Sequence, residues 1–196
     1  MKYEKGSDMR KAEHKIDKIF LDRWSPRAMS GGGISKEELF TLLEAARWAP
    51  SSFNEQPWRF IYAQRDTKHW KKFFDLLDDF NKTWCRNAAV LVCLVSSKKF
   101  QHSGKPNRNG VSDSGAAWEN LALQASLKGL VAHGMAGYDV EKARKELNVP
   151  EDYEIIHMIA IGNSGNPLEL PEKIREMEKP NSRKPVKELV FEGSFK

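Results

Sequence analysis

The sequence has few of the residues that bind metals or cross-link small secreted proteins. Its 196 residues include two cysteines, Cys85 and Cys93, and five histidines that are not paired at ligand intervals. A disulfide framework or a structural metal site needs more partners at regular spacing. We therefore expect neither. Cys93 lies inside the apolar run AVLVCLV and is expected to be a small core residue of a strand, with Cys85 in a polar turn just before it.

Long hydrophobic segments are also missing. No apolar run approaches the roughly 20 residues that span a bilayer. The N-terminal stretch MKYEKGSDMRKAEHK has no apolar segment of the kind found in signal peptides. Repeats, low-complexity tracts and a composition break that would mark a second domain are absent as well. We expect one domain over residues 1–196 that is cytoplasmic and does not associate with membranes.

Nucleic-acid-binding motifs are absent despite an excess of positive charge. The net charge is +5, but the two signs are interspersed except in residues 98–108 and the C-terminal region. No helix-turn-helix, zinc-finger or RNP-type pattern accompanies these cations, and Gly31-Gly32-Gly33 lacks the Lys and hydroxyl residues of a P-loop. We expect no nucleic-acid partner. The cations either form a solvated surface or attract anionic, phosphate-bearing ligands.

Hydrophobic periodicity predicts both helices and strands. Apolar residues recur at helical spacing over residues 8–21, 68–80, 112–129 and 140–147. Ser35 and Glu38 form the pattern of a capping box that opens another helix. Strands are expected over residues 59–62, 88–95 and 154–162, and the alternating segment 186–191 is typical of an edge strand.

The most distinctive stretch is APSSFNEQPW, residues 49–58. Pro50 and Pro57 each remove a backbone donor and favour extended geometry in the preceding residue, which predicts a rigid polar loop between a helix and a strand. Its polar side chains are those of Ser51, Ser52, Asn54 and Gln56. Such a row suits a polar, partly aromatic ligand better than a metal. Composition alone fits a well-made loop without a ligand equally well.

A second stretch, residues 23–27, reads RWSPR and places two guanidinium groups and a hydroxyl close together. Arg23, Ser25 and Arg27 can form an anion cradle, because arginine binds phosphate through two parallel hydrogen bonds. Pro26 prevents a regular helix from continuing through this stretch. By itself the pattern also fits a solvated turn.

Four stretches together resemble the nitroreductase-like flavoprotein family. They are DRWSPR (22–27), APSSFNEQPW (49–58), GLVAHGMAGYD (129–139) and NSRKP (181–185), in the family's order. The resemblance implies an α+β, nitroreductase-like fold with a central mixed, mainly antiparallel sheet of four or five strands flanked by helices. It also implies FMN as the cofactor and an intertwined homodimer with two FMN sites at its interface. Residues 180–196 would embrace the partner subunit, and segment 186–191 would add to its sheet.

The resemblance also implies the cofactor contacts. Arg23 and Ser25 are expected at the FMN phosphate and ribityl chain, and Arg27 beside the pyrimidine end of the flavin. The full set is Arg23, Trp24, Ser25, Arg27, Pro50, Ser51, Ser52, Asn54, Gln56, Asn81, Ala136, Gly137, Ser182 and Arg183. Ala136 and Gly137 lie in the stretch expected as a loop at flavin N5, Asn81 at the pyrimidine, and Ser182 and Arg183 in a phosphate clamp. Asn181 stands where relatives often have a cation, and Lys184 is a candidate substitute.

The implied activity is an FMN-dependent oxidoreductase that takes a hydride from NADH or NADPH. It would reduce nitroaromatics, quinones or related electrophiles in a ping-pong cycle. No side chain is expected to be a catalytic residue, because the cofactor supplies the chemistry, and His133 is expected to be structural or to face solvent. Two alternatives stay open: a specialised family member acting in flavin destruction, dehalogenation or peptide-heterocycle oxidation, and a flavin-binding protein without turnover.

Overall fold

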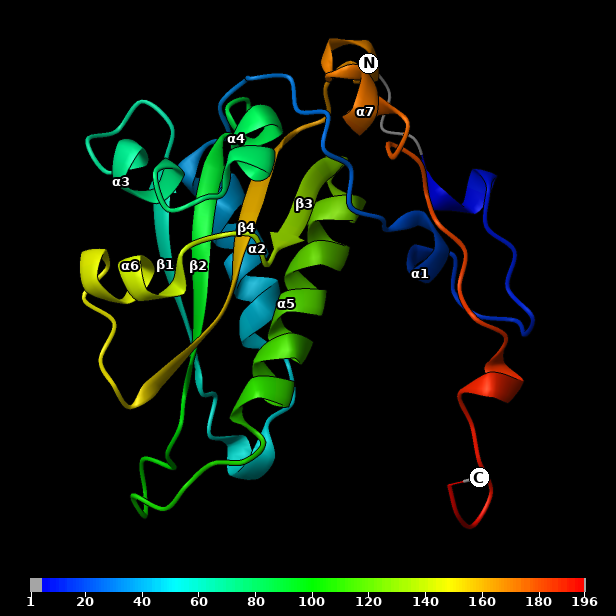
Figure 1. Ribbon diagram of the computed structural model, residues 1–196. Helices are drawn as coiled ribbons and strands as arrows, with labels where there is room; N and C mark the ends of the chain where they lie inside the picture. The colour runs from blue at the N-terminus through cyan, green and yellow to red at the C-terminus, as the bar shows by residue number, and fades with distance from the viewer. Residues whose placement is uncertain (1–4, 196) are drawn as a thin grey trace.

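A four-stranded sheet forms the centre of the computed structural model, which describes residues 5–195 (Figure 1). The strands are β1 (Trp58–Gln64), β2 (Val90–Ser97), β3 (Leu130–Met135) and β4 (Tyr153–Asn163), in the order β1-β2-β4-β3. All three pairings are antiparallel. The expected α+β fold with a mainly antiparallel sheet is therefore confirmed, and within residues 5–195 this sheet contains no parallel pairing.

Helices cover both faces of the sheet. The long helices α2 (Lys36–Arg47) and α5 (Gly110–Leu127) pack on one face, where Leu39, Leu42 and Leu121 are fully buried against β2 and β4. The short helices α3 (Trp70–Phe74), α4 (Asp79–Cys85), α6 (Val140–Glu146) and α7 (Glu172–Arg175) contribute to a second core on the opposite face. Every residue of β2 is buried, as its continuous apolar run predicts for a strand covered on both sides.

The ends of the two long helices follow local rules. The Ser35 hydroxyl accepts a hydrogen bond from Glu38 N–H (3.0 Å), and the Glu38 carboxylate accepts one from Ser35 N–H (2.7 Å), so the predicted capping box opens α2. Gly129 follows α5 with φ of +70°, a left-handed conformation that glycine adopts without steric cost.

The helix expected over residues 68–80 is wrong as a single element. The chain forms α3, leaves the helix at Asp75, and starts α4 after Asp78, whose carboxylate accepts a hydrogen bond from Asn81 N–H (2.7 Å). Between the two helices Leu77 pairs with Tyr138 in a β-bridge. Asn81 and Cys85 therefore belong to a helix, and Cys85 is fully buried instead of lying in a polar turn.

Three further expectations are corrected. Residues 8–21 form no helix apart from a 3-10 turn at Gly6–Asp8 and the short α1 (Ile19–Asp22), and the apolar Met9 and Ile16 are exposed. The stretch 129–139 contains β3 and is a loop only after Met135. Segment 186–191 has a 3-10 turn at Val186–Glu188 instead of an edge strand. In each case the sequence pattern alone does not decide whether a helix or strand forms, because the segment also needs a neighbour to pack against.

Both cysteines and two histidines are shielded from water. Burial raises the pKa of both cysteine thiols, that of Cys93 to about 12. Burial also lowers the pKa of His133 and of His157 to about 4, so both imidazoles are neutral at pH 7. The His157 ring packs edge-on against Trp118, with ring centroids 5.3 Å apart.

Gly137→Ala should destabilise the fold, because a Cβ at Gly137 would collide with the Asp78 carboxylate and the Asn81 carboxamide. Since Asp78 caps α4, neither group can move away freely, and we expect a loss of about 1 to 3 kcal/mol in the free energy of unfolding. Gly33→Ala is the matched control, because a Cβ there meets no atom within 4 Å. Urea unfolding checks this, and equal midpoints for the two variants would contradict it.

His157→Phe should reduce the loss of unfolding free energy as the pH falls from about 6.5 to 4. The folded protein holds His157 neutral down to about pH 4, whereas the unfolded chain protonates it near its ordinary pKa of about 6.5. Stability is therefore lost as the pH falls from about 6.5 to 4, by up to about 1.4 kcal/mol per pH unit for this group. Urea unfolding of both proteins between pH 7 and 4.5 measures the difference, and parallel curves would rule out this contribution.

Candidate functional site

The RWSPR stretch runs beside the C-terminal end of β4. Met29 pairs with Ser164 in a β-bridge, and Ser30 N–H donates to the Asn163 carbonyl (3.0 Å). The backbone N–H groups of Arg27 and Ala28 both donate to the Glu178 carboxylate at 2.8 to 3.0 Å. The segment from Arg23 to Arg27 is thereby fixed against the sheet and against the C-terminal part of the chain.

Arg23 and Ser25 are adjacent, as an anion cradle requires. The Arg23 guanidinium donates to the Ser25 hydroxyl (3.2 Å), and its Nε lies 3.4 Å from the Glu119 carboxylate of α5. The Arg23 side chain is 14% exposed and that of Glu119 47% exposed. Trp24 between them is buried. An anion bound here would share the positive charge of Arg23 with the half-exposed carboxylate of Glu119.

The Arg27 side chain enters the protein and keeps one donor unused. Its Nε is buried and has no hydrogen-bond partner within residues 5–195, and its guanidinium carbon lies 6.0 Å from the Phe80 ring centroid. Close by, the His133 ring packs on Trp84 at 4.7 Å, and its Nδ1 lies 3.0 Å from the Pro26 carbonyl oxygen. Burial and the Arg27 charge both lower the His133 pKa, which fits a structural role for this histidine.

Asn81 and the turn after β3 lie next to Arg27 in the fold. The Asn81 carboxamide donates to the Gly137 carbonyl (2.9 Å) and accepts from the Trp84 indole (3.2 Å). Asn81 is 7% exposed, whereas Ala136 lies on the surface. The structure therefore joins Asn81 to the turn at Ala136 and Gly137, and Arg27 lies against Phe80, the residue before Asn81. Most of the Asn81 carboxamide is already used within the protein.

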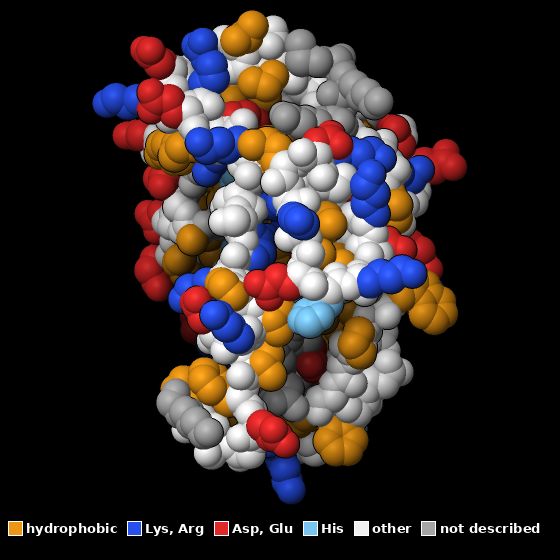
Figure 2. All heavy atoms as spheres, turned by 90° about the vertical axis from the view of Figure 1, so that its right-hand side faces the viewer, with side chains coloured by type: hydrophobic (Ala, Val, Ile, Leu, Met, Phe, Trp, Pro, Cys, Tyr) orange, Lys and Arg blue, Asp and Glu red, His pale blue; other side chains and the backbone are white. Residues whose placement is uncertain are grey.

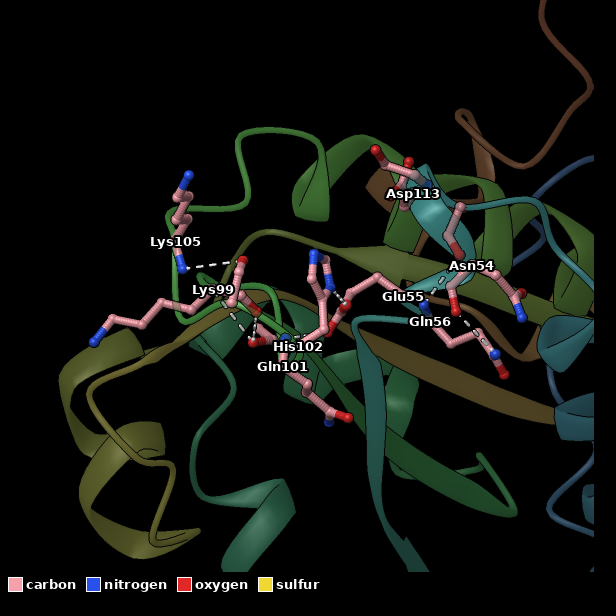
Figure 3. Close-up of polar contacts among 12 residues, drawn as sticks. Asn54, Glu55, Gln56, Lys99, Gln101, His102, Lys105 and Asp113 are labelled. Carbon is pink, nitrogen blue, oxygen red and sulfur yellow. Dashed lines mark hydrogen bonds and ion pairs between the residues drawn. The ribbon is translucent and has the colours of Figure 1, made fainter.

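The APSSFNEQPW loop has a rigid internal network (Figure 3). The Ser51 hydroxyl accepts from Gln56 N–H (3.0 Å), and the Gln56 carboxamide donates to the Asn54 carbonyl (3.1 Å). Ser52 N–H donates to the carboxylate of Asp113 in the first turn of α5 (3.0 Å). Pro50 is exposed at the start of the loop. The predicted row of polar groups exists, but several of its members hold the loop's own shape.

The APSSFNEQPW loop and residues 28–30, which follow RWSPR, lie at opposite ends of the sheet. The APSSFNEQPW loop leads into Trp58, which pairs with Ser96, and Ser96 pairs with Glu154 at the start of β4. Ser30, three residues after Arg27, lies at the other end of β4, beside Asn163. Since β4 has 11 residues, its ends are about 35 Å apart. Arg23 lies nearer to the loop, because it reaches Glu119 on α5, about 9 Å along that helix from the Asp113 that accepts from Ser52. Within one chain Arg27 is therefore far from the loop, whereas Arg23 is closer to it.

The C-terminal segment joins the RWSPR region through Arg10. The Arg10 guanidinium donates to the Arg23 carbonyl (2.6 Å) and to Asn181, at its carbonyl (2.9 Å) and its side-chain oxygen (3.3 Å). Arg183 donates to the same Asn181 side chain (3.2 Å), and Ser182 is exposed. Figure 2 shows Lys and Arg side chains gathered across this face. Sequence reasoning missed Arg10, Glu119 and Glu178, because no local motif marks them.

A cavity of about 610 Å³ lies between the N-terminal and C-terminal segments. Its lining includes Met9, Ile16 and Phe20 from one segment and Pro180 and Arg183 from the other. Within residues 5–195 no group of three or more His, Cys, Asp or Glu side chains could hold a metal ion. Among the helices of the same residues, none has the length and apolar character needed to cross a membrane.

Comparison with known proteins identifies relatives along most of the chain. The model of the nitroreductase family matches residues 21–82 and 68–163. A protein of Archaeoglobus fulgidus, provisionally named NADH dehydrogenase/NAD(P)H nitroreductase, is 32% identical over 149 residues, covering 74% of this chain and 83% of the relative.

Solved structures show the same similarity. A crystal structure described as an oxidoreductase containing FMN is 41% identical, with a TM-score of 0.91 over 95% of this chain and 96% of that chain. A provisionally assigned nitroreductase of Desulfovibrio desulfuricans, solved in complex with FMN, is 24% identical, with a TM-score of 0.71 over 94% of this chain and all of that one, and shows the fold alone. From the family model and these relatives, this chain belongs to the nitroreductase family.

Proposed function

We propose that this chain is an FMN-dependent oxidoreductase that uses NADH or NADPH to reduce electrophiles such as nitroaromatics and quinones. The observation that supports this most is the Arg27 guanidinium. It lies against Phe80, whose neighbour Asn81 donates to the Gly137 carbonyl, and its buried Nε has no partner among the described residues. A buried unpaired donor is costly unless a ligand completes it. The family relative at 41% identity contains FMN.

The donor set fits the chemistry of FMN. Arg23, Ser25 and Arg183 supply two guanidinium groups and a hydroxyl, which are the groups that recognise a phosphate ester. Arg10 ties the segments of Arg23 and Arg183 together through the Arg23 carbonyl and Asn181. The missing cation at position 181 is therefore offset in part by an arginine that reaches the same place from the N-terminal segment. Arg23, Ser25, Ser182 and Arg183 would hold the phosphate, and Arg27 and Asn81 the ring system.

When bound, FMN takes a hydride from NADH or NADPH and passes two electrons to the acceptor, in a ping-pong cycle. The protein's own contribution is binding and electrostatics. Arg27 would supply a fixed positive charge to the bound cofactor, and a positive charge near the negative charge that develops on reduction favours reduction. Ala136 and Gly137 offer small side chains and a backbone that a planar ring can approach closely. No described side chain is needed as a general acid, and the neutral His133 is occupied by Pro26.

We also propose that two copies of the chain form the functional unit. β4 starts next to the APSSFNEQPW loop and ends beside residues 28–30, which follow RWSPR, so Arg27 and the loop lie far apart in one chain, and a site that uses both would take the loop from a second chain. The C-terminal extension has exposed apolar side chains, with Leu189, Val190 and Phe195 at 60%, 64% and 88% exposure. Such side chains suit burial against a partner. We place this dimer in the cytoplasm, where NADH and NADPH are available.

The visible spectrum of the freshly purified protein tests the proposal. Bands near about 370 and 450 nm would identify oxidised flavin by the cofactor's own chromophore. Anaerobic addition of NADH or NADPH in separate cuvettes should bleach them and name the donor, and menadione or a nitroaromatic should restore them. A flavin that resists both nucleotides would favour a binding protein or a specialised relative. A colourless protein that cannot be reconstituted with FMN would overturn the proposal.

Arg27→Ala should lower the midpoint potential of the bound flavin while much of the FMN affinity remains. One charge-assisted hydrogen bond corresponds to about 30 to 60 mV for a two-electron couple. Arg27→Lys is the matched control, because it keeps a positive charge, and should shift the potential less. Potentiometric titration of the FMN-loaded variants measures this. An unchanged potential in an Arg27→Ala protein that still binds FMN would remove Arg27 from its assigned place.

A further inference from the structure

The APSSFNEQPW loop presents an exposed ring on a strained backbone. Phe53 lies in the left-handed region (φ 53°, ψ 23°), and φ is also positive at Asn54 (55°) and Gln56 (51°). This conformation is disfavoured for a bulky side chain and persists where the surroundings enforce it. The Phe53 side chain is nevertheless 84% exposed, so the strain does not serve to bury the ring. Strain of this kind concentrates at ligand sites.

A second loop, residues 99–106, is clamped to the first by Glu55. The Glu55 carboxylate accepts a hydrogen bond from Gln101 N–H (2.7 Å) and lies 3.5 Å from the Nδ1 of His102 (Figure 3). Its side chain is only 6% exposed. A carboxylate that gives up its hydration in this way needs a hydrogen-bond partner, and Gln101 N–H supplies it, so this bond holds the two loops together.

The clamp assembles three aromatic rings from the two loops, which we call the ring cluster: Phe53, Phe100 and His102. The Phe53 and Phe100 rings meet edge to face with centroids 5.9 Å apart, and His102 lies 6.1 Å from Phe53 and 5.5 Å from Phe100. These distances lie within the range of favourable aromatic pairs. Phe53 and His102 remain open to solvent, so the cluster can take a further ring.

Charged groups around the ring cluster do not cover it. Lys99 and Lys105 come from the same second loop, and Figure 3 shows their side chains extending away from His102. The Glu55 carboxylate, 3.5 Å from His102 Nδ1, is buried. The exposed part of the cluster is therefore mostly apolar ring surface, which favours a flat, uncharged aromatic molecule over an anionic one.

We propose that the ring cluster is the contact surface for aromatic electron acceptors and that Glu55 is the positioning residue that sets it. This rests on the proposed function, in which the APSSFNEQPW loop completes the flavin site of a second chain. The cluster then lies on the acceptor's side of that site. Phe53 contacts the acceptor directly, whereas Glu55 acts through Gln101 and His102.

The test compares two acceptors on FMN-loaded protein: nitrobenzene, which has a ring to stack, and ferricyanide, which has none. The measured quantity is the ratio of kcat/KM for nitrobenzene to kcat/KM for ferricyanide. Phe53→Leu should lower this ratio about threefold to tenfold, the range for loss of one aromatic contact. Phe40→Leu is the matched control, because Phe40 is also exposed (48%) and edge-on to a ring, that of Tyr62, but lies on α2.

Glu55 is tested by a pair of variants. Glu55→Ala removes the acceptor for Gln101 N–H and should lower the ratio as much as Phe53→Leu does. Glu55→Gln keeps an oxygen for that hydrogen bond and should restore most of the ratio. Rescue by the conservative variant is not expected of a residue that merely carries negative charge near the site.

The outcomes separate the two proposals. A wild-type protein that reduces both acceptors, with equal ratios in wild type, Phe53→Leu and Glu55→Ala, would overturn the ring cluster alone. A fall in the ratio for Phe40→Leu equal to that for Phe53→Leu would do the same. Wild-type protein that binds no FMN, or that oxidises no NADH or NADPH with either acceptor, would overturn the proposed function and this inference with it.

Discussion

Burial of β2 and β4 in the core fixes the length and direction of the sheet. The sheet in turn positions the segments that contain the candidate site residues. Its antiparallel register puts residues 28–30 beside the end of β4 and the APSSFNEQPW loop beside its start. The strands cannot shift in register without moving alternate side chains to the wrong face. The separation of Arg27 from the loop is thus a property of the core, and the proposal of a site shared between two chains rests on it.

Much of the fold could be predicted from the sequence, because strong local signals agreed with the packing. The capping box at Ser35 and the continuous apolar run of β2 needed no tertiary information. Predictions failed where tertiary contacts decided the outcome. The pattern over residues 8–21 is amphipathic, but Met9 and Ile16 have no core to pack on in one chain. The break between α3 and α4 depends on Asp78 and on the Leu77 bridge to Tyr138.

In the candidate site, too, local motifs could be predicted from the sequence, whereas their tertiary contacts could not. Its motifs are local in sequence and were visible there, including the arginines of RWSPR and the polar row of the loop. The groups that hold those motifs come from distant positions: Glu178 on the Arg27 and Ala28 backbone, and Arg10 between Arg23 and Asn181. Such partners lack a pattern of their own. The structure also explains Gly137 without a ligand, since Asp78 and Asn81 occupy the space of a side chain.

The burial of Cys85 and Cys93 has a consequence for an enzyme that handles electrophiles. Quinones and the reduction products of nitroaromatics alkylate thiolates, and the thiolate is the reactive form of cysteine. In this chain both sulfurs lie in the core, and burial raises the pKa of both thiols. The folded protein therefore offers almost no thiolate to such molecules. If the chain reduces such molecules as proposed, this burial protects it from covalent inactivation by them.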